Sequence, residues 1–251
     1  MQTKALPPAF IQAATRGLLH RPRKLLTTTT RHSSTRLPLL RRRIRPTSIR
    51  MQASAQNTLA EERDPGAVVG TSLRILKYPH PLLRAENATI ETFDEQLKQV
   101  AREMLRVMYA SRGVGLAAPQ VGINKRLMVF NPEGEQRAFL QEVVLVNPQI
   151  IASSKKTDVE MEACLSFPGM SGRVRRHEWV KIEAQRLNGK QFKAKYEGWK
   201  ARIFQHEFDH LEKTLYIDRL EEEDKPKVKD TLQQLVEVYK SEPYQSMQAA
   251  L

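Results

Sequence analysis

The sequence predicts an α+β domain in which antiparallel β-sheets pack around a central helix that carries an H-E-x-x-H motif, with flanking helices towards the N- and C-terminal ends. Two observations predict this class. Three segments repeat apolar residues at helical spacing, and short β-rich runs lie between them. Strands and helices do not alternate regularly, as they would in a parallel fold. A length of 251 residues allows one sizeable domain with an extension.

The positive charge is concentrated at the start of the chain. The formal net charge is +13, and residues 1–60 contain 12 of the 41 basic residues but none of the 28 acidic ones. A segment rich in Arg, Ser, Thr and Leu and free of acid is typical of an organelle transit peptide. We therefore expect residues 1–60 to be a disordered, cleaved transit peptide and linker. Residues 61–240 would form the folded domain, and residues 241–251 a C-terminal tail.

The composition also limits the class of protein. No run of about 18 apolar residues occurs, which excludes a membrane-embedded protein. Cys164 is the only cysteine, so the chain cannot form an internal disulfide, and a reducing compartment is indicated. An alternative interpretation of the basic leader is an arm that binds RNA or anionic lipid.

The first elements expected in the body are a strand and a helix. Apolar and polar residues alternate over residues 73–78, which predicts a short strand before a Pro-His-Pro break. Thr92 and Glu95 have the spacing of a capping box, and apolar residues then recur at helical spacing over residues 97–108. Gly113 ends this pattern, so an amphipathic helix is predicted here.

The later elements are strands followed by two helices. Residues 127–130 and 143–146 are β-rich runs that each precede Asn-Pro, which predicts strands ending in turns. Residues 180–185 and 191–196 flank Asn188-Gly189, the dipeptide that suits a two-residue hairpin turn. Helical spacing of apolar residues predicts the remaining two elements, at residues 199–211 and 225–240.

The chemistry is concentrated in His206-Glu207-Phe208-Asp209-His210, inside the helix expected at residues 199–211. At 3.6 residues per turn, His206 and His210 share one helix face and can reach the same metal ion, with Glu207 beside it. A plain alternative is a solvated face of charged side chains. Open catalytic sites normally have three protein ligands, and Cys164 is the candidate for the third. Considered without the two histidines, Cys164 would be interpreted as a small buried apolar residue.

A Gly- and Ala-rich segment, residues 113–120, follows the first helix. Such residues let a ligand approach the backbone, and the amide of Gln120 could donate a hydrogen bond to a developing oxyanion. The plain alternative is a helix C-cap and packing turn. The segment does not end in Lys-Ser/Thr, so it is not a phosphate-binding P-loop.

Taken together, the segments GVGLAAPQ (113–120), EACLS (162–166) and QHEFDH (205–210) resemble, in order and spacing, the three signature motifs of the peptide deformylase family. The resemblance covers about residues 71–220. It implies that Cys164, His206 and His210 bind Fe²⁺, which Zn²⁺, Ni²⁺ or Co²⁺ can replace.

The resemblance also implies a reaction and a substrate. Removal of the formyl group from N-formylmethionyl nascent peptides would release formate, with Glu207 taking a proton from water and returning it to the leaving amine. The amide of Gln120 and the backbone N–H of Leu165 would stabilise the oxyanion. The substrate's extended backbone would pair with Val114, Gly115 and Ala163, and an apolar pocket beside the His206 helix would take its methionine side chain.

Bacterial-type translation begins with formylmethionine, which gives a transit peptide on such an enzyme a physiological reason. We expect the chloroplast stroma, with the mitochondrial matrix as the other possible location. Contact with the ribosome would be transient, and we expect no stable nucleic-acid binding by the mature domain and no membrane association.

Four further residues carry expectations. We expect Glu162 or Asp209 to accept a hydrogen bond from a metal-bound imidazole, although a surface charge would equally explain Asp209. The family usually has Gly where this chain has Ala163, and often Gly at Lys213. If either position needs a positive φ, the replacement costs roughly 1 kcal/mol, and we expect a changed rate or specificity.

Two other functions remain open on the sequence. One is a zinc peptidase of the H-E-x-x-H class, whose third ligand would be a downstream glutamate such as Glu221 or Glu237. That interpretation leaves Cys164 without a role. The other is a non-enzymatic RNA- or ribosome-binding protein, suggested by the net charge.

Overall fold

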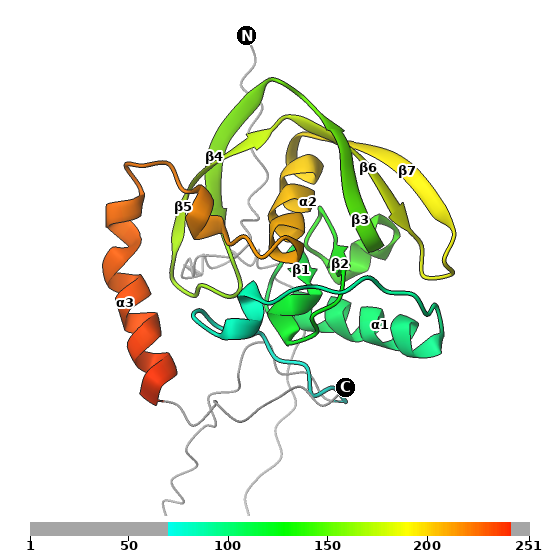
Figure 1. Ribbon diagram of the computed structural model, residues 1–251, viewed down its shortest axis with the longest axis horizontal. Coiled ribbons are helices and arrows are strands. Elements are labelled where there is room, and N and C mark those ends of the chain that lie inside the picture. The colour runs from blue at the N-terminus through cyan, green and yellow to red at the C-terminus, as the bar shows by residue number, and fades with distance from the viewer. Residues whose placement is uncertain (1–69, 242–251) are drawn as a thin grey trace, which may run out of the picture. The chain divides into compact units, whose positions relative to one another are not determined.

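The computed structural model describes residues 70–241, so the expected transit peptide (residues 1–60) and all but the first residue of the expected tail lie outside the described residues. Within this range the predicted α+β class is confirmed. Figure 1 shows two antiparallel sheets with one helix, α2, between them, and further helices at the periphery. The strands are β1 (Gly115–Ala117), β2 (Leu127–Phe130), β3 (Val143–Ser153), β4 (Thr157–Ala163), β5 (Ser171–His177), β6 (Trp179–Gln185) and β7 (Gln191–Glu197).

The larger sheet has the strand order β1-β2-β3-β6-β7, and the smaller pairs β4 with β5. The long helices are α1 (Glu95–Ala110), α2 (Gly198–Leu211) and α3 (Lys225–Ser241). Short 3₁₀ turns complete the described elements: η1 (Pro81–Arg84), η2 (Ala118–Val121), η3 (Gln136–Gln141) and η4 (Tyr216–Arg219). None of these helices is both long and apolar enough to cross a membrane.

The core places α2 so that its polar residues are also buried. Phe204 and Ala201 of α2 pack on the large sheet, in a cluster that includes Phe130 and Tyr196. A second cluster joins α1 to β1 and β2, and a third surrounds Cys164. Since sheets flank α2, even its His and Glu side chains are shielded from water.

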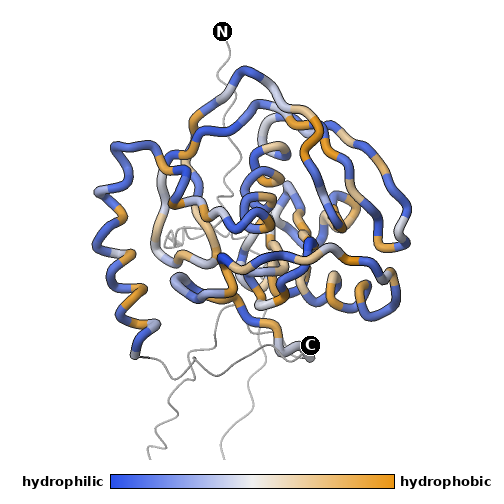
Figure 2. The backbone as a smooth tube through the Cα atoms, in the orientation of Figure 1, coloured by the Kyte–Doolittle hydropathy of each residue, from blue (hydrophilic) through white to orange (hydrophobic). Residues whose placement is uncertain are grey.

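The peripheral helix α3 is less buried than α2. Only Val228 of α3 is fully buried, whereas Leu232 and Leu235 are partly buried against the third cluster. The tube of α3 in Figure 2 changes repeatedly between hydrophobic and hydrophilic colours, as expected for an amphipathic helix at the edge of a domain.

Four local predictions are wrong, and the first two concern residues before α1 or at its start. No strand forms at residues 73–78; this segment instead makes single backbone bonds, from Leu76 N to Gln120 O (2.7 Å) and from Tyr78 N to Ser166 O (2.9 Å). The helix cap is Asp94, whose side chain accepts a hydrogen bond from Leu97 N, and not Thr92.

The other two wrong predictions concern turns. Strand β3 does not end at Asn147-Pro148, because a register shift between Val146 and Gln149 accommodates the missing N–H of the proline. The β6–β7 hairpin is confirmed, but its turn is not of the two-residue type. Gly189 has a φ of 79° and its N–H bonds Arg186 O, so only the glycine takes the left-handed conformation.

Candidate metal centre

The side chains of Cys164, His206 and His210 meet in the interior. Their ligand atoms lie within 4.8 Å of one another, and all three residues are buried. Cys164 directly follows β4, and the histidines occupy successive turns of α2 with ring centroids 5.4 Å apart. The Sγ atom of Cys164 is 3.4 Å from Nε2 of His210. The fold thus unites residues more than forty positions apart in the sequence.

This donor set fits a divalent metal ion. A thiolate and two imidazoles give three protein ligands and leave a coordination position for water or substrate. The Nδ1 atom of His206 is 2.9 Å from Glu162 Oε2, which leaves Nε2 for the cluster. Burial lowers the pKa of His210 well below its usual value, which favours the neutral form that a metal ligand requires. Thiolate and imidazole ligands suit several divalent transition metals.

Glu207 lies beside this cluster, and its environment is unusual for a carboxylate in both burial and hydrogen bonding. It is buried, and its Oε2 atom has no hydrogen-bond partner among the described residues. Burial raises the pKa of Glu207 to about 7. A carboxyl group with a pKa near neutrality can take up and release a proton under physiological conditions.

Gly115 makes room for Glu207. A Cβ atom at this glycine would lie 2.9 Å from the Cγ and Cδ atoms of Glu207, closer than real Cβ contacts. A residue with a side chain at this position would therefore force the Glu207 side chain to shift.

Gln120 is held with its amide nitrogen towards the thiol. Its Oε1 atom accepts a hydrogen bond from Ala117 N at 2.8 Å, which fixes the amide orientation. Its Nε2 atom is 3.4 Å from both Cys164 Sγ and Ser166 Oγ. The donor expected from the sequence is therefore at the cluster, in a buried position.

The residues expected to bind a peptide lie on two sheet edges. Gly115 begins β1, an edge strand of the larger sheet, and Val114 precedes it. Ala163 ends β4 in the two-stranded sheet, and Leu165 follows two residues later beside Cys164. A strand at an edge has backbone groups that can pair with an extended peptide.

Of the two proposed carboxylate partners, only Glu162 reaches an imidazole. Asp209 instead accepts hydrogen bonds from the guanidiniums of Arg176 and Arg219, so the expectation that it orients a histidine directly is wrong. The reason is geometric: Asp209 lies about 100° round the helix from His210, on the side that faces Arg219.

Sequence reasoning missed the cations around Glu162. Arg176 binds both oxygens of Glu162 at 3.0 and 2.9 Å, and Arg202 Nη1 binds Oε1 at 2.8 Å. Burial would raise the pKa of Glu162, but the charge of Arg176 and hydrogen bonds from His206 and Arg176 hold it well below its usual range. The sequence held one signal of this burial. Residues two apart in a strand face the same side, so Arg176 lies on the same face of β5 as the buried Val174.

The two departures from the family pattern differ in outcome. Lys213 has a φ of 61°, a conformation that favours glycine, whereas Ala163 is not among the described residues with positive φ. The backbone cost expected for such a replacement therefore applies at Lys213 only.

The glutamates of the peptidase alternative do not join the cluster. Glu221 accepts a hydrogen bond from Arg175 at 3.0 Å, and Glu237 one from Gln233 at 3.0 Å on α3. The metal-donor group found among the described residues contains Cys164 and neither glutamate. The peptidase alternative is therefore not favoured.

Comparisons with known proteins agree with this site. A family model described as polypeptide deformylase matches residues 72–226. The chloroplastic peptide deformylase 1B of Oryza sativa subsp. japonica is 47% identical over 167 residues, which cover 66% of this chain and 62% of that protein. Its chloroplastic/mitochondrial counterpart in Arabidopsis thaliana is 46% identical over 169 residues, or 67% of this chain and 62% of that protein.

The chain thus spans about three fifths of the length of these plant relatives. A crystal structure of peptide deformylase from Plasmodium falciparum superposes with a TM-score of 0.65 at 44% identity, covering 66% of this chain and 97% of that one. With the family model matching well over half of its length, and with the three motifs gathered around one buried donor cluster, this chain belongs to the polypeptide deformylase family.

Proposed function

We propose that this chain is a metal-dependent hydrolase that removes the N-formyl group from the formylmethionine of nascent organelle-encoded polypeptides and releases formate. One observation carries the proposal: a buried Cys-His-His donor set lies beside a buried carboxyl group that has a free oxygen. Family membership supports the choice of a formylated peptide over other amides.

Cys164, His206 and His210 would hold the metal ion, which we propose to be Fe²⁺, with Zn²⁺, Ni²⁺ or Co²⁺ as substitutes. When bound, such an ion acts as a Lewis acid that makes water a better nucleophile and the formyl carbon a better electrophile.

Proton transfer falls to Glu207. Its Oε2 atom is free to accept a proton from the attacking water, and the carboxyl group then returns this proton to the nitrogen as the C–N bond breaks. The products are formate and a peptide with a free amino group. The amide of Gln120 and the backbone N–H of Leu165 would donate hydrogen bonds to the oxygen that gains charge in the transition state.

The substrate would lie between the two sheets as an added strand. The backbones of Val114 and Gly115 on one side and of Ala163 on the other offer edge positions for this pairing. An apolar pocket beside α2 would take the methionine side chain. The methyl group of Ala163 narrows this groove relative to the glycine usual in the family, so we propose an altered rate or specificity.

We propose that residues 1–60 direct the protein to the chloroplast stroma, with the mitochondrial matrix as a second location. The relatives are named chloroplastic or chloroplastic/mitochondrial, and the basic, acid-free composition of this segment supports import. The mature domain would contact ribosomes transiently and not bind nucleic acid stably. A fusion of residues 1–60 to a fluorescent protein tests the location, and diffuse cytosolic fluorescence would contradict it.

A formate-release assay tests the activity. The anaerobically purified protein, supplied with Fe²⁺, Ni²⁺ or Co²⁺, should release formate from formyl-Met-Ala-Ser. Cys164→Ser should abolish this metal-dependent release. Cleavage within unformylated peptides that survives Cys164→Ser would instead favour a peptidase, and no formate release with any of these ions would refute the proposal.

A further inference from the structure

A continuous row of charged side chains leads away from the candidate metal centre. Nδ1 of His206 meets Glu162, and both oxygens of Glu162 are bound by Arg176. Nη1 of Arg176 donates to Oδ2 of Asp209, whose two oxygens are bound by Arg219 at 2.7 and 2.8 Å. These five residues, which we name the charge row, begin at the His206 imidazole and alternate in sign from Glu162 outwards.

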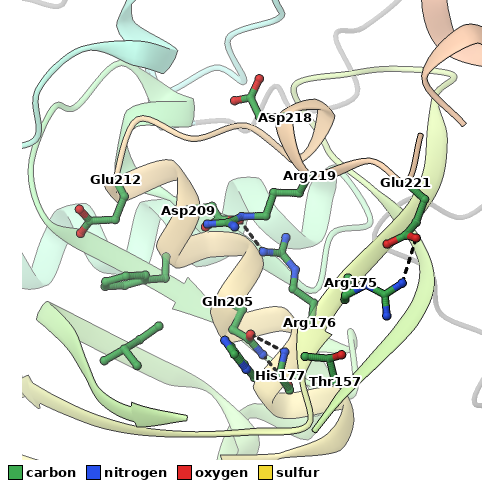
Figure 3. Close-up of a pocket in the computed structure, with 12 residues that line it drawn as sticks. Thr157, Arg175, Arg176, His177, Gln205, Asp209, Glu212, Asp218, Arg219 and Glu221 are labelled. Carbon is green, nitrogen blue, oxygen red and sulfur yellow. Dashed lines mark hydrogen bonds and ion pairs between the residues drawn. The ribbon is translucent and has the colours of Figure 1, made fainter. Parts of the chain in front are cut away.

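The outer end of the charge row opens on a pocket of about 540 Å³. Figure 3 shows Arg219 and Arg176 both reaching Asp209 in this pocket. The residues of α2 that line it are Gln205, Phe208, Asp209 and Glu212, whereas the residues facing the metal cluster are His206, Glu207 and His210. By helical geometry the two sets occupy opposite sides of α2.

Arg176 connects the inner and outer members of the charge row, although Glu162 is also bound by Arg202. Arg176 is only 4% exposed, and a buried guanidinium is tolerated only when its charge and its donors are matched. Glu162 uses Nε and Nη2 of Arg176, and Asp209 takes Nη1. Asp209 is in turn fixed by Arg219, whose side chain is 48% exposed and bonds both carboxylate oxygens.

We propose that Arg176 is a positioning residue for His206 and that Arg219 anchors Arg176 from the pocket side through Asp209. The inference rests on the proposed metal site. By fixing the carboxylate of Glu162, Arg176 would fix the rotation and tautomer of the His206 ring, so that Nε2 stays directed at the metal. The charge row therefore lets a half-exposed arginine influence how firmly the metal is held, without touching metal or substrate.

The chain offers a matched control for this test. Arg175 lines the same pocket, is 55% exposed and pairs with Glu221 through one hydrogen bond, but it is not part of the charge row. Arg219→Ala and Arg175→Ala therefore remove equivalent surface charges. Only the first should disturb the metal site.

The experiment uses Co²⁺-loaded full-length protein. The readouts are the rate of Co²⁺ release to a chromogenic chelator and the thiolate-to-cobalt absorption band. We expect Arg219→Ala to speed Co²⁺ release about three- to tenfold, less than the roughly 10- to 100-fold effect of removing a direct partner of a ligand. Arg219→Lys should speed release less than Arg219→Ala. Arg175→Ala should stay within about twofold of the unchanged protein, with both alanine variants melting at similar temperatures.

A second variant tests the inner link. Arg176→Lys keeps the charge but cannot bind both oxygens of Glu162, so release should speed about 10- to 100-fold. Adding Arg219→Ala to Arg176→Lys should change the rate of Co²⁺ release little further, because both substitutions act through the contact between Arg176 and Glu162. Equal release from the Arg219→Ala and Arg175→Ala proteins would overturn the inference. If the unchanged protein shows no cobalt–thiolate band, or Cys164→Ser keeps it, the proposed metal site fails instead.

Discussion

Two buried carboxylates flank His206, and their surroundings shift their pKa values in opposite directions. Glu162 accepts hydrogen bonds from Arg176, Arg202 and His206. Burial would raise its pKa, but the charge of Arg176 and the hydrogen bonds from His206 and Arg176 hold it well below the usual range. One oxygen of Glu207 has no hydrogen-bond partner within residues 70–241, and burial raises the pKa of Glu207 to about 7. Both residues are about 1% exposed, so the partners and not the depth decide the protonation state.

The difference separates two tasks that the same functional group could perform. A permanently ionised carboxylate gives a fixed direction to the imidazole that it contacts. A carboxyl group whose pKa is near neutrality gains and loses a proton at little cost. The surroundings of Glu162 therefore suit orientation of an imidazole, and those of Glu207 suit the proton transfer that we propose for it.

The largest effect should follow removal of the proposed proton acceptor, Glu207. Glu207→Gln keeps the side-chain volume but cannot accept a proton, so we expect kcat for formate release to fall about 10²- to 10⁴-fold. Metal content, measured by atomic emission, should stay unchanged, because Glu207 is not in the donor set. Activity within tenfold of the unchanged protein at full metal content would show that another group moves the proton.

Glu162→Gln should act on metal retention and stability instead. The variant leaves Arg176 and Arg202 buried without their shared anion, which we expect to cost about 3–5 kcal/mol of unfolding free energy. Metal affinity should fall about 10- to 100-fold, as for other direct partners of ligating histidines. Urea unfolding and chelator competition measure the two effects.

Glu160→Gln is the matched control for that variant. The carboxylate of Glu160 also approaches Arg202, at 3.6 Å, but its side chain is 40% exposed. Its loss should change stability by less than about 1 kcal/mol and leave metal affinity unaltered. If Glu162→Gln behaved like this control, the contrast between the two buried carboxylates would lose its energetic basis.

Gly115→Ala tests how closely Glu207 must be placed. The added Cβ would overlap the Glu207 side chain and move the carboxyl group, and a displacement of about 1 Å can cost up to about 10²-fold in rate. We expect kcat to fall about 10- to 100-fold, with metal content and melting temperature little changed. An unchanged kcat would mean that the Glu207 side chain moves aside without losing its function.

The sequence predicted those parts of the site that local periodicity controls. The i, i+4 spacing of His206 and His210 determines their shared face on any helix, so their meeting could be anticipated. The helix at residues 199–211 and the hairpin strands were predicted for the same reason, since each pattern repeats over several residues.

Features that depend on tertiary contacts escaped prediction. Arg176 and Arg202 surround Glu162 only because β5 and α2 pack against β4, and no spacing in the sequence encodes that meeting. The proline after Asn147 suggested a strand end, but a bulge let β3 continue along β6. Of the two carboxylates considered for contact with an imidazole, Asp209 is instead fixed by Arg176 and Arg219.

The smallest expected effect concerns the end of α2, where Lys213 adopts a φ of 61°. The N–H of Lys213 bonds His210 O at 3.4 Å and that of Thr214 bonds Asp209 O at 2.9 Å, a helix end that favours glycine. Lys213→Gly should therefore raise the unfolding free energy by about 1 kcal/mol and the melting temperature by about 2–4 °C.

Lys213→Ala separates this backbone effect from loss of the ion pair with Glu86, whose atoms are 3.6 Å apart. Alanine keeps the strained conformation and removes the same pair, so it should give no gain in stability. Because the turn that ends at Lys213 carries both His210 and Asp209, the Gly variant should also release metal no faster than the unchanged protein. Faster release would mean that the left-handed lysine contributes to holding the ligand in place. Equal melting of the Gly and Ala variants would show that the backbone at this position is not strained.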